Sequence, residues 1–371
     1  MGKVAEYLYR KAAKNKIPLG GSFELSPVCN FSCKMCYVRK TEAQIRKEGK
    51  TIKNWKEWLE LAKQCREQGV LYLLLTGGEP FLYPNFRELY EQLHDMGFVL
   101  SINTNGTMID EETIEWLKKK APSRINITLY GASEETYKSI CGSAKGYEKA
   151  VWAIRALKDA GIPIVINASM IPENSQDMET IIAFGKELGV NVRMSTYMFP
   201  PIRRECEKED SRFAAAEAAV MCLRKLKCQF GFHSYCEDAE RKLKTLEKSV
   251  VTEEDWGFAD TEEYMRCRAG RSTFWVSWTG AMSACGLTEF PILVYPFENG
   301  FKNCWEVLTE KVRTTMVLKA CSGCEKKEIC NPCVAMIHAE TGDANKKSSY
   351  LCEMTDYMIQ RMQEDLERRT L

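Results

Sequence analysis

Short apolar runs alternate with longer amphipathic stretches through the first two hundred residues of the chain. Most of the amphipathic stretches end in a turn with a glycine, which is a common residue just past the end of a helix. Alternating strand and helix patterns predict repeated βα units and a parallel sheet. The strands are predicted at 22–26, 70–76, 98–104, 124–130, 163–170 and 191–196, and the helices near 55–68, 85–96, 111–120, 146–160 and 177–188.

Six βα units are too few to close an eight-stranded barrel, but they suit an open one. We therefore predict an α/β fold built on a partial (β/α)6 barrel. In folds of this kind the chemistry lies at the C-terminal ends of the strands.

The pattern changes after the sixth predicted strand. An Ala-rich stretch and a charged stretch predict helices, and then short strands, turns and closely spaced cysteines follow until a final helix near 352–368. The sequence therefore predicts four parts. These are an N-terminal segment (1–21), the barrel (22–200), a helical bridge (201–260) and a cysteine-rich domain (261–371).

Composition and charge exclude several classes of protein. The chain has 371 residues, enough for one large core, and a net charge of +1, which gives no electrostatic reason to expect nucleic acid or an acidic membrane as a partner. It begins without the pattern of a signal peptide and has no apolar run long enough to cross a bilayer. We therefore expect a cytoplasmic protein. Its 17 cysteines then favour metal or cluster binding, because cytosolic thiols stay reduced.

Three cysteines follow the first predicted strand directly. Cys29, Cys33 and Cys36 form a C-x3-C-x2-C pattern in "SPVCNFSCKMCY", and no histidine lies nearby in the sequence. A structural zinc site usually needs four protein ligands. Three thiolates from one loop instead fit a [4Fe–4S] cluster with one iron left open. The alternative is three unrelated buried cysteines.

This stretch resembles the cluster-binding loop of the radical SAM superfamily. The resemblance implies that the open iron binds the amino and carboxylate groups of S-adenosylmethionine, and that reductive cleavage gives a 5′-deoxyadenosyl radical, which abstracts a substrate hydrogen. Cys29, Cys33 and Cys36 would then be the catalytic cluster ligands. Met35 stands where the family most often has an aromatic residue beside the adenine, and a thioether can pack on that ring comparably.

A glycine-rich turn follows the second predicted strand. Gly77, Gly78, Glu79 and Pro80 would form an ordinary turn if they stood alone. In this position they look like the superfamily's GGE motif, which implies that Glu79 and the nearby backbone hold the methionyl amino group.

Further polar residues follow or lie in the later strands. Thr104 and Asn105, in "NTNG", would point polar atoms into the same end of the predicted barrel, where the strands finish, although Asn-Gly is also a common turn. We favour Asn167 and Arg193 for contacts to the ribose or the carboxylate of the cofactor. Any such residue could equally be a satisfied core polar group. The other candidates are Tyr130, Ser133, Ser169 and Ser195.

A second group of cysteines occupies the last hundred residues. Cys267 and Cys285 flank Gly280 in a C-x12-G-x4-C element, and "CSGCEKKEICNPC" and Cys352 follow. This order resembles the SPASM extension of radical SAM enzymes, which implies two auxiliary [4Fe–4S] clusters and three clusters in total. By matched position, one auxiliary cluster takes Cys321, Cys324, Cys330 and Cys352, and the other takes Cys267, Cys285 and Cys333.

Two details of this second group stay open. The last gap is one residue shorter than usual, and a zinc ribbon of Cys321, Cys324, Cys330 and Cys333 is the rival reading, although it leaves three cysteines unused. Some relatives have a fourth cysteine at the position of Thr261. In this chain Glu262, Cys304 or water could fill that place. The remaining cysteines are expected to be ordinary thiols; they are Cys65, Cys141, Cys206, Cys222, Cys228, Cys236 and Cys304.

The resemblance implies a peptide or protein substrate. We expect an oxidoreductase that forms a thioether or carbon–carbon crosslink in a ribosomally made peptide, with flavodoxin or ferredoxin as electron donor. Sulfatase maturation, small-molecule dehydrogenation through the auxiliary clusters and a purely electron-transferring protein are the alternatives. Gly286 stands where sulfatase-maturating relatives carry a catalytic carboxylate, which argues against the first of these. Only residues 1–21 precede the first predicted strand, so recognition of a leader peptide would come from a separate protein or from the barrel.

Overall fold

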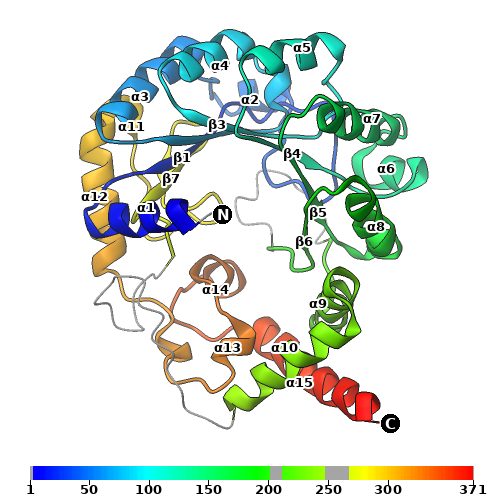
Figure 1. The fold of residues 1–371 in the computed structure, drawn as a ribbon. Coiled ribbons are helices and arrows are strands. Elements are labelled where there is room, and N and C mark those ends of the chain that lie inside the picture. Colours follow the sequence, from blue (N-terminus) through cyan, green and yellow to red (C-terminus); the bar gives the residue numbers. More distant parts are fainter. Residues whose placement is uncertain (1–2, 201–210, 247–266, 371) are drawn as a thin grey trace.

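The computed structural model describes residues 3–200, 211–246 and 267–370. Its centre is a sheet in which six consecutive strands run parallel, in the order in which they occur in the chain. Figure 1 shows these strands as an open arc, so the predicted partial (β/α)6 barrel is confirmed. The strands are β1 (Gly20–Glu24), β2 (Tyr72–Thr76), β3 (Val99–Thr104), β4 (Arg124–Thr128), β5 (Ile164–Ser169) and β6 (Val192–Ser195).

Helices cover the outside of the arc (Figure 1). The five predicted helices are present with ends close to those expected from the pattern. Helix α3 shows why, since the Asn54 side chain accepts hydrogen bonds from the first-turn amides of Lys56 and Glu57, while Glu57 accepts from the Asn54 amide. These helices are α3 (Trp55–Glu67), α4 (Phe86–Asp95), α5 (Glu111–Lys119), α7 (Gly146–Asp159) and α8 (Met178–Leu188).

The pattern missed one helix of this layer. Helix α6 (Glu134–Cys141) follows β4, and Ser133 is its N-cap, because the Ser133 hydroxyl accepts from the Thr136 amide at 3.1 Å. Gly142 ends it with φ of +74°. Ser133, a candidate for the cofactor site, therefore caps a helix.

The two faces of the sheet differ in polarity. Large apolar side chains such as Phe23, Leu75 and Ile127 are fully buried on the helix-covered face. The opposite, inner face is polar, and the strand register places Asn103 beside Asn126, whose amide nitrogen donates to the Asn103 side-chain oxygen at 2.7 Å. The space enclosed by the arc is thus lined by groups that can bind a polar ligand.

The cysteine-rich part extends the same sheet. Strand β7 (Thr273–Val276) pairs in parallel with β1, and β8 (Met282–Ser283) pairs with β7 in antiparallel fashion, which gives eight strands in the described part of the chain. Short strands were expected in this region, but the pairing of β7 with β1 was not. The predicted boundary at 200/201 adjoins the segment 201–210 and the one at 260/261 falls within 247–266, both outside the described residues, so the four-part division stays a prediction.

The expected helical bridge forms a small bundle with the C-terminal helix. Helices α9 (Ala215–Phe230), α10 (Phe232–Leu246) and α15 (Ser349–Thr370) pack together around a separate apolar cluster. The Tyr235 hydroxyl donates to Asp365 at 2.8 Å, and Lys227 pairs with the same carboxylate. None of the described helices is long and apolar enough to cross a membrane.

The N-terminal segment contains a helix that the pattern did not predict. Helix α1 (Lys3–Lys14) lies where the strands begin, because Tyr9 stacks on Tyr72, the first residue of β2, with ring centroids 5.6 Å apart. A Cβ at Gly20 would lie 2.7 Å from the Tyr9 hydroxyl, so this contact needs glycine there. The remaining elements are α2 (Glu42–Lys47), α11 (Pro296–Asn299), α12 (Phe301–Thr314), α13 (Lys327–Cys330), α14 (Val334–Thr341), and the 3-10 turns η1 (Pro80–Leu82), η2 (Pro172–Asp177) and η3 (Lys319–Cys321).

Candidate cofactor site and cysteine groups

The glycine-rich turn packs directly on the start of the first cysteine loop. The Gly78 amide donates to the Ser26 carbonyl at 2.7 Å, and the Glu79 amide donates to the Val28 carbonyl at 2.9 Å. A Cβ at Gly78 would lie 2.3 Å from the Val28 oxygen, and one at Gly77 would lie 2.4 Å from the Ser26 oxygen. The two backbones approach this closely only because both positions are glycine.

Glu79 is held in one orientation inside the protein. Its side chain is buried, and one carboxylate oxygen accepts from the Thr104 hydroxyl at 2.7 Å and from the Phe81 amide at 3.2 Å. The other oxygen accepts from the Asn105 amide at 2.8 Å. Burial raises the pKa of Glu79 to about 7, although these hydrogen bonds act to lower it. A cation beside this carboxylate would favour its charged form.

A second set of hydrogen bonds joins Asn105 to the cysteine loop. The side-chain nitrogen of Asn105 donates to the side-chain oxygen of Asn30 at 2.8 Å and lies 3.8 Å from the Cys29 sulfur. Asn30 in turn donates to Thr107 at 2.8 Å. Glu79, Thr104, Asn105 and Cys29 therefore belong to one network. Asn30 and Thr107 were not among the expected site residues, although Asn30 could have been found from its place between two of the cysteines.

The first cysteine loop fits a cluster. The Phe31 amide donates to the Cys29 sulfur at 3.4 Å and the Arg39 amide donates to the Cys36 sulfur at 3.2 Å, which are donors of the kind that thiolate ligands accept. Within the described residues, no three Cys, His, Asp or Glu side chains converge closely enough for a single metal ion. The same holds for Cys321, Cys324, Cys330 and Cys333, the four thiols of the zinc-ribbon alternative.

The other expected cofactor contacts do not join the network. Met35 is half-buried against the main core. Asn167 and Arg193 lie side by side on the inner face of β5 and β6. Arg193 lies close enough to Arg124 to affect the pKa of that residue. No described contact links Asn167 or Arg193 to Glu79 or to the cysteine loop.

The C-terminal thiols fall into two neighbourhoods. Burial raises the pKa of the Cys330 thiol, and the nearby thiols of Cys352, Cys321 and Cys324 raise it further. Burial also raises the pKa of Cys267, and there the neighbouring thiol is that of Cys333. The structure thus places Cys333, at the start of α14, near Cys267, whereas the thiols that act on Cys330 are those of Cys352, Cys321 and Cys324.

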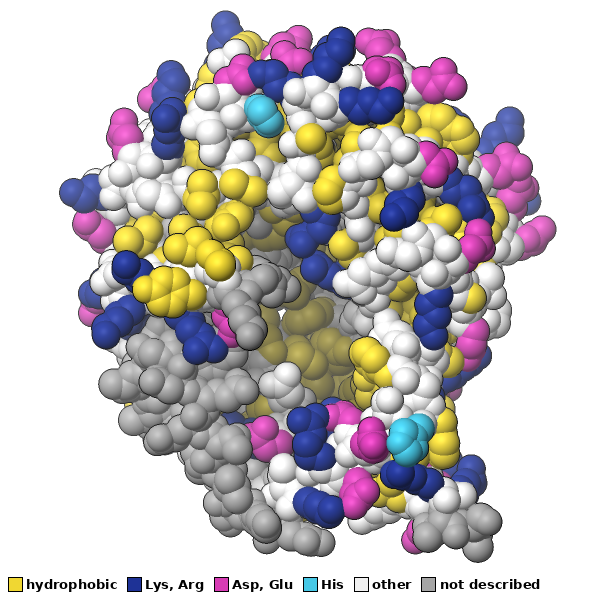
Figure 2. Space-filling view, viewed as in Figure 1, with side chains coloured by type: hydrophobic (Ala, Val, Ile, Leu, Met, Phe, Trp, Pro, Cys, Tyr) yellow, Lys and Arg dark blue, Asp and Glu magenta, His cyan; other side chains and the backbone are white. Residues whose placement is uncertain are grey.

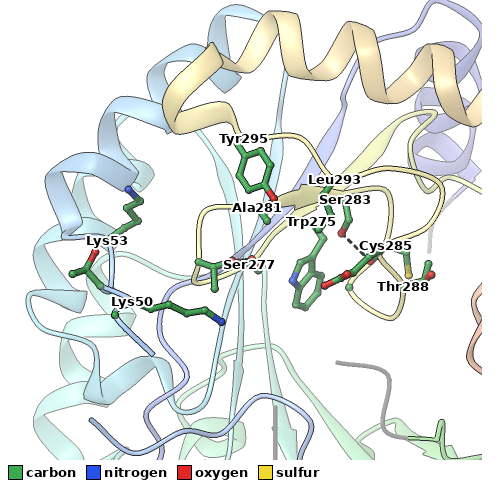
Figure 3. A pocket seen from close by; sticks show the side chains of 15 residues that line it. Lys50, Lys53, Trp275, Ser277, Ala281, Ser283, Cys285, Thr288, Leu293 and Tyr295 are labelled. Atoms are coloured by element: carbon green, nitrogen blue, oxygen red, sulfur yellow. Dashed lines mark hydrogen bonds between the residues drawn. The ribbon is translucent and has the colours of Figure 1, made fainter. Parts of the chain in front are cut away.

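Cys285 follows β8 and lines a cavity of about 450 Å³ (Figure 3). In Figure 3 Lys50 reaches across this cavity toward Trp275 and Ser277, whereas Lys53 points away. Next to Cys285, a Cβ at Gly286 would lie 2.6 Å from the Trp275 ring. The indole therefore fills the place in which a catalytic carboxylate at position 286 would have to stand.

Of the two suggested extra protein ligands, the structure describes Cys304. Cys304 is buried on α12, next to the Tyr295 backbone and Glu298. Thr261 and Glu262 lie outside the described residues. The fourth ligand of the group formed by Cys267, Cys285 and Cys333 therefore has no assigned residue.

Residues 23–185 match the model of the family described as "Radical SAM superfamily". These residues, somewhat less than half of the chain, thus match the superfamily that the cysteine loop and the glycine turn resemble. Among curated proteins, the AdoMet-dependent heme synthase of Methanosarcina barkeri is 25% identical over 337 residues, which are 89% of this chain and 95% of that protein. The PqqA peptide cyclase of Granulibacter bethesdensis is 26% identical over 172 residues, 46% of this chain. The match spans 45% of the cyclase, so it covers about half of that relative.

Two solved structures share the fold along nearly the whole chain. Streptococcus suis SuiB bound to precursor peptide SuiA superposes with a TM-score of 0.64 at 18% identity, covering 92% of this chain and 78% of SuiB. Native anSMEcpe with bound AdoMet and Cp18Cys peptide has a TM-score of 0.65 at 17% identity, covering 95% and 99% of the two chains. The expected radical SAM match is thereby confirmed for residues 23–185, and the two solved structures share the fold of the cysteine-rich part as well.

Proposed function

We propose that this radical SAM enzyme modifies a peptide or protein by abstracting a hydrogen atom from it. The observation that carries the proposal is the network from Glu79 through Asn105 to Cys29, at the C-terminal ends of β2 and β3. It sets a buried carboxylate beside a three-cysteine loop. This arrangement suits a ligand that has an ammonium group and also binds an open iron.

Each expected residue has a proposed role. Cys29, Cys33 and Cys36 hold the first [4Fe–4S] cluster, and the Glu79 carboxylate accepts from the ammonium group of S-adenosylmethionine. Gly77, Gly78 and Pro80 shape the turn around that group, while Thr104 and Asn105 orient Glu79. Met35 packs on the adenine, and Asn167 and Arg193 reach the ribose or the carboxylate. When bound, the cluster and S-adenosylmethionine supply a 5′-deoxyadenosyl radical.

The C-terminal thiols would hold two auxiliary clusters, which brings the total to three. The neighbourhood of Cys321, Cys324, Cys330 and Cys352 supports one of them, and that of Cys267 and Cys333, with Cys285, supports the other. Joining a thiol sulfur to a carbon removes one hydrogen atom from the carbon, and one proton and one electron from the thiol. That last electron needs an acceptor, which suits the auxiliary clusters, whereas flavodoxin or ferredoxin would donate the electron that cleaves S-adenosylmethionine.

The solved relatives support a peptide as the substrate. SuiB binds precursor peptide SuiA, and anSMEcpe was solved with a Cp18Cys peptide. PqqA peptide cyclase also matches part of the chain. We infer that the product is a thioether or carbon–carbon crosslink in a ribosomally made peptide, formed in the cytoplasm, where the thiols of the enzyme remain reduced.

A second candidate is oxidation of a small molecule. It is favoured by the AdoMet-dependent heme synthase, which matches 89% of this chain and 95% of its own length. Sulfatase maturation is less well supported, because the Trp275 ring lies within 2.6 Å of any Cβ at Gly286.

The test is reductive cleavage of S-adenosylmethionine by the anaerobically reconstituted protein, followed by assay with peptides encoded beside its gene. We expect about twelve irons per chain from three four-iron clusters, and about eight when Cys29, Cys33 and Cys36 are all replaced by Ala. The triple variant should not release 5′-deoxyadenosine.

Cleavage that persists in this variant would refute the cluster assignment, and zinc in place of iron at the C-terminal sites would refute the auxiliary clusters. A peptide product that lacks two hydrogens supports crosslinking, whereas turnover of a porphyrin-type substrate alone would favour the second candidate.

A further inference from the structure

A cavity of about 780 Å³ lies on the inner face of the sheet, near the ends where the strands begin. Tyr9 of α1 lines it on one side, and Trp275 and Cys285 of the C-terminal part line it on another. Figure 2 shows the molecule hollowed between the sheet and the C-terminal helices, with Lys and Arg side chains on the wall of the hollow. The volume lies in the range of pockets that bind small organic ligands.

Arg124, the first residue of β4, is the cationic residue in the lining of this cavity. Its Nε atom is buried and has no hydrogen-bond partner among the described residues. Burial lowers the pKa of its guanidinium, the nearby Arg193 lowers it further, and Tyr9 raises it. The described groups that act on Arg124 thus include a second cation and a phenol, and no carboxylate.

Arg124 is half-buried, so its guanidinium loses part of its hydration without gaining an opposite charge from the described residues. The same group presents parallel N–H donors that match the two oxygens of a carboxylate. The hydroxyl-bearing side chains of Tyr9, Tyr72 and Ser101 line the cavity as well and can donate to a bound anion.

We propose that this cavity binds a carboxylate of the substrate through Arg124, with Arg193 nearby as a second cation. The inference rests on the proposed function and specifies its substrate class, namely molecules that carry a carboxylate away from the reacting carbon. Two sources share this chemistry, an acidic side chain of a peptide and the carboxylates of a porphyrin-type small molecule.

The position of the cavity fits such an anchoring role. Tyr37, which follows the cysteine loop directly, lines it, and so do Cys285 and Gly286 of the second cysteine group. A substrate anchored at Arg124 would therefore reach toward Tyr37 and Cys285.

The test is equilibrium binding to the anaerobically reconstituted holoenzyme with two matched pairs of probes. The first pair is mesoporphyrin and its dimethyl ester; the second is a peptide of alternating Glu and Gly and its Gln counterpart. We expect one acid to bind better than its neutral partner. Arg124→Met should weaken the binding of that acid by roughly tenfold or more. The neutral partner should be unaffected. Arg87→Met, which removes an exposed arginine on α4, is the control and should change nothing.

The pair that shows the preference identifies the source. Absence of a preference for either acid over its neutral partner would overturn the proposal, and so would unchanged binding of the acid to Arg124→Met. If that variant does not fold, protection of Arg124 from phenylglyoxal by the acid, measured in the unaltered protein by mass spectrometry, replaces it; no protection would refute the assignment. The rate of S-adenosylmethionine cleavage without substrate should be equal in the unaltered protein and in Arg124→Met. A failure of carboxylate binding is therefore distinguishable from a failure of the proposed function.

Discussion

At the scale of single residues, the chemistry of the site depends on one buried carboxylate. Glu79 is 1% exposed and accepts three hydrogen bonds, so it is fixed in place before a cofactor arrives. Burial disfavours its charge, and an ammonium group would favour that charge. The cofactor and the proton therefore compete for the same side chain.

We expect Glu79→Gln to weaken binding of S-adenosylmethionine by roughly ten- to a hundredfold, because a charged hydrogen bond contributes about 1.5–3 kcal/mol. Iron content should not change, since the cysteines remain. Equilibrium dialysis under anaerobic conditions measures the affinity. Glu91→Gln, on the exposed part of α4, is the matched control. An affinity equal to that of the unaltered protein would make Glu79 a turn residue only.

The pKa of Glu79, raised from 4.5 to about 7, predicts a pH dependence of binding. Below pH 7 the cofactor-free protein holds a proton on Glu79 that must leave before an ammonium group binds. The affinity for S-adenosylmethionine should therefore fall as the pH decreases below about 7, by up to about tenfold per pH unit. Glu79→Gln should show a flat profile over the same range. A profile that stays steep in the variant would assign the proton to another group.

The raised pKa has the opposite consequence for stability. The folded cofactor-free protein binds this proton more tightly than the unfolded chain does, so the contribution of Glu79 to stability is complete below pH 4.5 and is lost as the pH rises through 7. Binding and stability should thus respond to pH in opposite directions.

At the scale of elements, two loops are held together by backbone contacts. Gly78→Ala should push the turn after β2 away from Val28, because the new Cβ would lie 2.3 Å from a carbonyl oxygen that cannot move as a side chain could. We expect a loss of about 1–3 kcal/mol in stability and weaker binding of S-adenosylmethionine. Thermal unfolding and equilibrium dialysis measure the two effects.

Gly161→Ala is the control for this substitution. Gly161 has φ of +74° and nothing within 4 Å of an added Cβ, so alanine there should cost only about 1 kcal/mol of backbone strain. It should leave cofactor affinity unchanged. If both variants bind the cofactor equally well, the close approach of the two loops is not what shapes the site.

At the scale of the whole molecule, the barrel and the C-terminal part share a buried ionic contact. Glu340 of α14 accepts from the Tyr197 hydroxyl and from Arg212, each at 2.7 Å, and the Glu340 and Arg212 side chains are 6% and 17% exposed. The contact therefore ties the chain after β6 to the cysteine-rich region. Together with the β1–β7 pairing, it makes the two parts one structure.

Glu340→Ala should lower the free energy of unfolding by about 3–5 kcal/mol, because it leaves Arg212 buried without its carboxylate. Glu364→Ala removes the carboxylate of a more exposed pair with Arg361 and should cost less than about 1 kcal/mol. Urea unfolding of both variants measures the difference. Equal midpoints would show that the contact between Glu340 and Arg212 adds no stability.

The local features of this protein could be predicted from its amino acids alone. Apolar periodicity located the six barrel strands and five of the helices, since these patterns depend only on neighbouring residues. Spacing alone singled out the first cysteine loop. Resemblance marked the glycine turn and the grouping of the later cysteines. A short helix such as α6 was missed, although its cap at Ser133 and its glycine end were readable.

Only the tertiary structure decided which distant segments meet. It paired residues 20–23 with 273–276, and it joined Glu79 to Cys29 through Asn105. It also turned Arg124, at the start of a predicted strand, into a cation that faces a cavity. Such contacts depend on the burial of whole faces and on strand register, which are properties of the packed chain. Local pattern carries no information on them, because many partners would satisfy each strand equally well.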